Sequence, residues 1–192
     1  MLTQKLTGTA STSRLGWFAA AAVLANLLLI ASAKIQVPFW PVPMTMQTAA
    51  ILAVGMGFGA RGALLVVGAY LVEGALGLPV FAGTPERGLG LAYMAGPTGG
   101  YLLGFLVAAV LTGWAAERGW LSSFWKAAAG MVAGHALILT LGALWLGIAM
   151  GWDAAWRSGV EPFLLATLFK AGLGAALFGA LGTLRTWLEG SR

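Results

Sequence analysis

The sequence predicts an all-α integral membrane protein in which six helices cross the bilayer as one membrane domain over residues 1–192. Its composition is the first reason: 59% of the residues are hydrophobic, 9% are charged, and the mean hydropathy is +0.87. Soluble domains carry about 25% charged residues, so this chain lacks the polar surface that water requires. Its apolar runs are also continuous, which is typical of spanning helices and not of lipid-facing strands. A soluble enzyme and a disordered chain are therefore excluded.

The positions of the charges delimit the helices, because charged residues are costly inside hydrocarbon. Four long runs contain no charge: 15–33, 35–60, 88–116 and 127–152. Two more contain a single charge, which is Glu73 in one and Lys170 in the other. A helix needs about 20 apolar residues to cross a bilayer. After the Pro-rich start of the second run is set aside, we expect helices at about 16–33, 44–60, 62–78, 98–116, 124–150 and 161–186.

The basic residues predict that both termini are cytoplasmic, because Lys and Arg gather on the inner side of a membrane. With the N-terminus inside, the inner side holds Lys5, Arg14, Arg61, Arg118, Lys126, Arg185 and Arg192. The outer side holds Lys34, Arg87 and Arg157. An alternative is that Ala31-Ser32-Ala33 is the cleavage site of a secretory signal, which would leave five spans. On the first reading the net charge of +5 needs no nucleic-acid partner.

Several kinds of chemistry have no carrier in this sequence. None of the four lysines stands in a Gly-Lys-Ser/Thr phosphate loop, so the chain has no ATP site of that type. Cysteine is absent, and a single histidine, His135, is a poor metal centre by itself. No Gly-x-Ser-x-Gly nucleophile motif is present. We therefore expect no catalytic residues, no metal and no cofactor.

Two ionisable residues lie inside predicted helices. Glu73 is roughly 7–8 Å from the outer end of its helix and Lys170 roughly 13 Å from the outer end of the last one, at about 1.5 Å per residue. Such residues usually pair with each other or contact a polar ligand. One reading is a structural ion pair between them. The other is a site in which Lys170 supplies a positive charge or a donor to a small polar molecule.

The predicted outer loops and the small residues also stand out. Three prolines make 37–43 stiff, and the loop 83–96 leads into Pro97-Thr98-Gly99-Gly100-Tyr101, where a helix start can hold a carboxylate. Small residues four apart allow helices to approach closely in lipid. Examples of such pairs are Gly55/Gly59, Gly100/Gly104, Gly130/Gly134 and Ala21/Ala25. We expect packing within the chain for the glycine pairs, whereas the first helix could instead dock another membrane protein.

Taken together, these segments resemble the BioY family, the biotin-specific S component of energy-coupling-factor (ECF) transporters. The residues that carry the resemblance are Pro41-Val42-Pro43-Met44-Thr45-Met46-Gln47-Thr48, Tyr70-Leu71, Gly77-Leu78-Pro79-Val80-Phe81-Ala82-Gly83, Gly96-Pro97-Thr98-Gly99-Gly100-Tyr101, and Pro162-Phe163-Leu164 with Lys170. They occur in family order and spacing over about residues 15 to 185.

The resemblance implies a six-helix S-component bundle in a prokaryotic cell membrane that captures biotin from outside as its transported ligand. Energy would come from a partner transmembrane subunit and a pair of ATPases, and Ala21 and Ala25 match the positions that meet that subunit. The residues that we expect to bind biotin are Lys170, Thr167, Tyr101, Gly99, Thr98, Glu73, Gln47, Trp40, Phe81, Tyr93 and Arg87. Among these, Lys170, Arg87 and the amides near Gly99 are equal candidates for the biotin carboxylate.

One departure from the family pattern concerns the last helix. Many relatives resemble Pro-Phe-x-x-Gly-Asp-x-x-Lys, and Ala166 and Thr167 stand here at the Gly-Asp positions while Lys170 is kept. The Thr167 hydroxyl can still bond a ureido ring, though more weakly than a carboxylate. We therefore expect Glu73 to supply the missing acceptor. The rival readings are an S component for another vitamin, such as thiamine or riboflavin, and a membrane scaffold without a ligand.

Overall fold

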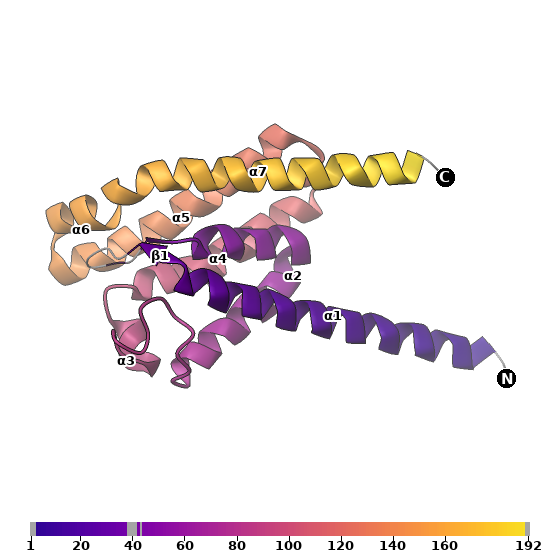
Figure 1. Ribbon diagram of the computed structural model, residues 1–192, viewed down its shortest axis with the longest axis horizontal. Coiled ribbons are helices and arrows are strands. Elements are labelled where there is room, and N and C mark those ends of the chain that lie inside the picture. Colours follow the sequence, from indigo (N-terminus) through magenta and orange to yellow (C-terminus); the bar gives the residue numbers. More distant parts are fainter. Residues whose placement is uncertain (1–2, 38–41, 43, 191–192) are drawn as a thin grey trace.

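The computed structural model describes residues 3–37, 42 and 44–190, with side chains from 15 to 37, at 42 and from 44 to 178. Its elements, in chain order, are α1 (Thr3–Lys34), β1 (Gln36–Val37), β2 (Met44–Thr45), α2 (Gln47–Ala75), α3 (Gly90–Ala95), α4 (Gly99–Glu117), the 3-10 turn η1 (Trp120–Ser122), α5 (Phe124–Met150), α6 (Trp152–Gly159) and α7 (Glu161–Gly190). Both termini lie at one end of the bundle, and α3, α6 and β1 lie at the other (Figure 1). An all-α membrane architecture is thus confirmed.

Among the described residues, five helices are long and apolar enough to cross a membrane, and one of them, α2, is divided by a kink. Helix α2 is two helices joined at Gly59, whose backbone (φ 72°, ψ 176°) leaves the helical region. A φ in that range is easy only for glycine. With the two arms of α2 counted separately, the described residues contain the six long helices that the sequence predicts, although the sequence analysis divided the second from the third at Arg61 and not at Gly59.

The break at Gly59 is completed by a side chain from α4. The Ala60 amide, at the start of the second arm of α2, donates to Oε1 of Glu117 over 2.8 Å. A carboxylate is favourable at a helix start, because the first amides have no partner within the helix and the dipole is positive there. The loss of backbone hydrogen bonds at the break is thereby partly offset.

Two predicted boundaries of α2 were wrong by three residues. The helix begins at Gln47 and not at 44, because Met44 and Thr45 form a short antiparallel pair with Val37 and Gln36. It ends at Ala75 and not at 78, because Gly77 takes a positive φ of 94° and turns the chain. The strand pair and the short helices α3 and α6 have no counterpart among the predicted elements.

Small residues set the distances between the long helices. A Cβ on Gly55 would collide with Ala109 and Thr112 of α4, and one on Gly104 would lie 2.9 Å from the Cα of Ile138 in α5. A Cβ on Gly134 would lie 2.5 Å from the side chain of Leu52. The predicted role of the glycine pairs in packing within the chain is confirmed. It is also the expected way to hold helices together where lipid offers no hydrophobic driving force.

The outside of the bundle is apolar. Trp17 is 77% exposed, Leu165 80% and Ile148 83%, whereas Leu29, Ile51 and Leu146 are fully buried. Exposed side chains of this size would be unfavourable in water over so large a surface, but they are the natural contacts of lipid tails.

Candidate functional site

A cavity opens inside the bundle at the end where α3 and α6 lie. Its volume, measured as the space that a water-sized sphere can occupy, is about 40 Å³, so the cavity is narrow. Its walls come from the strand pair and the start of α2, from the loop before α3, and from α3, α4, α5 and α7. The lining residues are Val42, Thr45, Gln47, Thr48, Ala82, Tyr93, Thr98, Tyr101, Leu102, Phe105, His135, Ile138, Leu139, Phe163, Thr167 and Lys170.

Lys170 is the charged residue of this lining, and it is 6% exposed. Its ammonium nitrogen Nζ donates to the carbonyl of Thr45 over 2.6 Å and to Oγ1 of Thr48 over 3.2 Å. An ammonium has three donors, so these two bonds leave one for another partner. Burying the charge is costly, and the two oxygens offset part of that cost. The predicted ion pair with Glu73 does not form, because each group has other partners.

A chain of hydrogen bonds ties the start of α2 to the loop that closes the cavity. Nε2 of Gln47 donates to the hydroxyl of Tyr70 over 2.6 Å, and that hydroxyl donates to the carbonyl of Val80 over 3.0 Å. Tyr70 is fully buried and Gln47 is 3% exposed. Buried polar groups need hydrogen-bond partners, so these two bonds fix the position of the loop relative to α2.

Three aromatic rings pack together at this loop, and one of them, Phe81, belongs to it. Phe81 stacks on Tyr93 with ring centres 5.0 Å apart, and its other neighbour, Tyr70, meets it edge-on at 5.4 Å. The Tyr93 hydroxyl donates to the carbonyl of Ala82 over 2.8 Å. Burial raises the pKa of Tyr93, so its phenol stays protonated at neutral pH and keeps donating. Such ring pairs add rigidity beyond the apolar area that they bury.

Lys34, the last residue of α1, anchors the same loop from the other side. Its ammonium group donates to the carbonyls of Phe81 and Thr84 and to Oγ1 of Thr84, each over 3.0 Å. All three donors are therefore used on one short segment. Sequence reasoning counted Lys34 only as an outer charge, and its position directly after the predicted first helix gave no sign of this contact.

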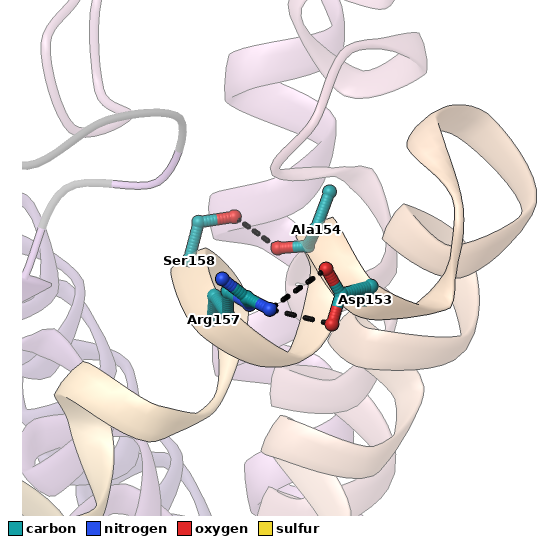
Figure 2. Close-up of polar contacts among 4 residues, drawn as sticks. All are labelled: Asp153, Ala154, Arg157 and Ser158. Carbon is teal, nitrogen blue, oxygen red and sulfur yellow. Dashed lines mark hydrogen bonds and ion pairs between the residues drawn. The ribbon is translucent and has the colours of Figure 1, made fainter.

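The short helix α6 is held against α4 by Tyr101, one of the residues that line the cavity. The Tyr101 hydroxyl donates to the carbonyl of Gly159 over 2.6 Å, so the last residue of α6 is fixed to α4. The outer side of α6 carries an ion pair between Arg157 and Asp153 (Figure 2), in which the side chains are 72% and 82% exposed. An exposed pair of this kind contributes little to stability. The contact with Tyr101 therefore matters more for the position of α6.

His135 of α5 also lines the cavity, and sequence reasoning missed it. The ring is 2% exposed, its Nδ1 lies 2.8 Å from the carbonyl of Met131, and its Nε2 has no hydrogen-bond partner. The sequence analysis considered His135 only as a metal ligand, and a single histidine gives no evidence for a metal site or for any other role. Among the residues that the structure describes, no three His, Asp or Glu side chains gather as metal ligands would.

Comparison with known proteins places this architecture. The model of the BioY family matches residues 4–186, which is nearly the whole chain. The chain belongs to the BioY family. It is 35% identical over 164 residues to the biotin transporter BioY2 of Lactococcus lactis subsp. cremoris, covering 82% of this chain and 88% of that protein. It is 34% identical over 142 residues to a probable biotin transporter BioY of Pyrococcus horikoshii, covering 72% of this chain and 80% of that one.

A solved structure shares the fold. The S-component for biotin from an ECF-type ABC transporter superposes with a TM-score of 0.76 at 24% sequence identity, over 88% of this chain and 92% of that chain. The sequence expectation of a BioY-type S-component fold is confirmed.

Six of the residues that the sequence pointed to are brought together on the cavity wall: Lys170, Thr167, Tyr101, Thr98, Gln47 and Tyr93. Phe81 lies one layer behind, under Tyr93. Gly99 is at the start of α4, where a Cβ would collide with Met94 and approach the Trp145 ring to 3.1 Å, so it permits packing and does not line the cavity. Trp40 lies outside the described residues.

Arg87 lies in a neighbouring hollow and not on the cavity wall itself. That hollow is lined by Glu86, Arg87, Ala92, Tyr93, Gly96, Pro97 and Thr98. Tyr93 and Thr98 belong to both linings, so the two spaces adjoin.

Glu73 is not brought to the cavity. It lines a groove between α1 and the second arm of α2, where its Oε1 accepts from Nδ2 of Asn26 over 3.0 Å. Glu73 and Lys170 were expected at similar depths in the membrane, but their side chains line different spaces. Ala21 and Ala25 are also divided, since Ala21 is exposed and Ala25 is 8% exposed in the core. The two alanines therefore do not form one exposed stripe.

Proposed function

We propose that this chain is the biotin-binding S component of an ECF-type vitamin transporter and captures biotin from outside the cell. The observation that carries the proposal is the buried cavity with one ammonium group, Lys170, among aromatic and aliphatic walls. Biotin presents an apolar fused ring, a neutral ureido group and a carboxylate. Such a ligand requires apolar walls, a few donors and acceptors, and a positive charge.

The arrangement supports one orientation of the vitamin. The ring system would lie in the cavity, with the ureido carbonyl facing the free donor of Lys170 and the hydroxyl of Thr167. The carboxylate would reach the adjoining hollow of Arg87. Gly99 is a weaker candidate for the carboxylate, because its amide already donates to the carbonyl of Gly96 over 3.1 Å. Charge-assisted bonds at both ends would account for tight capture.

The test is equilibrium binding by the purified protein in detergent or nanodiscs, with biotin, thiamine and riboflavin as separate ligands. We expect biotin to bind in or near the nanomolar range, at about −12 kcal/mol, and the other two vitamins not to be retained. Thiamine or riboflavin binding in place of biotin would transfer the proposal to another vitamin. No binding of any of the three would favour the scaffold reading.

We further propose that the transport energy comes from a partner transmembrane subunit with a pair of ATPases in a prokaryotic cell membrane. The lack of a phosphate-loop lysine in the sequence supports a separate energy source. The exposed face of α1, on which Ala21 lies, is the proposed contact for that subunit. Co-purification of the chain with such a module, and its loss on Ala21→Trp, would test this contact.

The proposed topology places both termini in the cytoplasm. It rests on seven inner against three outer basic residues. Because the chain has no cysteine, a single introduced thiol reports on one position. Asp153→Cys is expected to react with a membrane-impermeant maleimide in intact cells, whereas Ser122→Cys should react only after lysis. The reverse pattern would invert the topology.

A further inference from the structure

The two ring nitrogens of His135 have different surroundings. Nδ1 lies 2.8 Å from the carbonyl of Met131, one turn earlier in α5. A carbonyl can only accept, so Nδ1 carries the hydrogen. Nε2, on the far side of the ring from its own helix backbone, is buried and has no partner. An unpaired polar atom in a protein interior is uncommon and calls for an explanation.

The surroundings determine what Nε2 offers. The ring shares its cavity with the ammonium group of Lys170, and a second positive charge among apolar walls would be unfavourable. In the neutral ring with hydrogen on Nδ1, Nε2 presents a lone pair. His135, a residue of the cavity lining, therefore carries a hydrogen-bond acceptor that has no partner among the described residues.

Acceptors are scarce around this cavity. No Asp or Glu is among the described residues that line it, and Lys170 can only donate. The hydroxyls of Tyr93 and Tyr101 are directed to the carbonyls of Ala82 and Gly159. The threonine hydroxyls can accept a hydrogen bond, but each also needs an acceptor for its own hydrogen. Nε2 accepts without donating, as does the amide oxygen of Gln47, and among the described residues it is the buried side-chain nitrogen or oxygen that lacks a partner.

We propose that Nε2 of His135 accepts a hydrogen bond from a ureido N–H of bound biotin and so selects ligands that carry this donor. The inference rests on the proposed function, because the ureido group belongs to that ligand. A ureido ring has two N–H donors and one carbonyl oxygen. Lys170 and Thr167 serve the carbonyl, and His135 serves an N–H that would otherwise be buried without a partner. The bond also gives Nε2 the partner that it lacks among the described residues.

A pair of substitutions separates the two nitrogens. His135→Asn places an amide near Nδ1, where it can still donate to the Met131 carbonyl, but it removes the acceptor at Nε2. His135→Gln extends an amide oxygen to about the position of Nε2. We expect His135→Asn to weaken biotin binding about tenfold, as for the loss of one buried hydrogen bond, and His135→Gln to restore most of the affinity.

A second experiment uses the unaltered protein, so it does not depend on how a variant folds. Biotin methylated on either ureido nitrogen is compared with desthiobiotin, which keeps both N–H groups and the carboxylate. We expect at least one methylated ligand to bind about tenfold or more weakly than biotin, and this difference to shrink in His135→Asn. Desthiobiotin should remain as sensitive to His135→Asn as biotin itself.

Direct observation is possible because the chain has one histidine. In protein labelled with ¹⁵N-histidine and purified without a histidine tag, biotin should shift the Nε2 resonance and leave Nδ1 nearly unchanged. Unchanged Nε2 and equal biotin affinity of the wild type and His135→Asn would overturn the inference while leaving biotin binding in place. No biotin binding by the wild type would overturn the proposed function, and this inference with it.

Discussion

Glu73 and Lys170 each place a charge inside an apolar helix of this protein, and their surroundings differ. Lys170 is 6% exposed on the wall of a cavity and bonds oxygens of Thr45 and Thr48. Glu73 is half-buried in a groove between α1 and α2 and bonds Asn26. The sequence presents both as single charges in apolar runs. Only the first faces a space that residues from four long helices enclose together.

The comparison shows that an intramembrane charge has two ways to be tolerated. One is to line a polar cavity, where a ligand can complete its hydrogen bonds. The other is to find a partner on a neighbouring helix, which satisfies it without a ligand. Asn26 serves Glu73 in the second way, so the groove needs no bound molecule. The cavity, by contrast, still holds an unused donor and an unused acceptor.

The largest expected effect comes from Lys170→Met, which keeps an apolar stem of similar length and removes the ammonium. Biotin affinity is expected to fall by at least about 2 kcal/mol, roughly 30-fold, because a buried charge-assisted bond is lost. Equilibrium binding measures it. The melting temperature without biotin should not fall, because an apolar stem has no desolvation cost. Equal affinity of the variant and the wild type would remove Lys170 from the site.

A second effect concerns packing beside the cavity. A Cβ on Gly142 would collide with the ring of Tyr101, which is held by its bond to Gly159. Gly142→Ala is therefore expected to destabilise the protein by about 1–3 kcal/mol. Thermal unfolding in detergent measures the change.

The matched control lies on the arm of α2 that carries Glu73. A Cβ on Gly68 meets nothing within 4 Å, so Gly68→Ala should leave stability unchanged or raise it by about 0.5–1 kcal/mol. If both variants lost the same amount of stability, the packing around Gly142 and Tyr101 would not be tighter than the packing around Gly68.

A third, smaller effect tests the loop anchor. Lys34→Met removes three donors to Phe81 and Thr84 while keeping the stem. Biotin is expected to dissociate faster and to bind about fivefold more weakly, near 1 kcal/mol, because the loop over the cavity loses its attachment to α1. Stopped-flow dissociation kinetics check this. Lys126→Met, an exposed change at the other end of the bundle, should leave the rate as in the wild type.

The smallest expected effect is that of Glu73→Gln, which keeps the shape and the contact with Asn26. Biotin affinity should change by less than about twofold, or 0.4 kcal/mol, because the groove is separate from the cavity. The same titration as for Lys170→Met measures it. A tenfold loss would restore Glu73 as a ligand residue and erase the distinction between the two charges.

Sequence motifs predicted many residues of the site. The residues that they did not predict were missed for one shared reason. Lys170, Thr167, Tyr101 and Gln47 stand in short patterns whose residues lie on one helix or at its start. His135 and Lys34 belong to no recognisable motif. Their roles depend on residues far away in the sequence, such as Phe81 for Lys34. Glu73 was misplaced for the same reason: depth follows from residue count, but direction depends on which helix is adjacent.

The sequence by itself determined that the chain resides in lipid, that it crosses six times, and that glycine stripes bring its helices together. These properties follow from composition and local periodicity, which act wherever the segment lies. The tertiary structure alone decided that α2 breaks at Gly59, that Glu73 and Lys170 face separate spaces, and that Nε2 of His135 remains unpaired at the cavity wall. Each of these depends on contacts between residues distant in sequence, and a local pattern does not encode which of its faces a distant partner will cover.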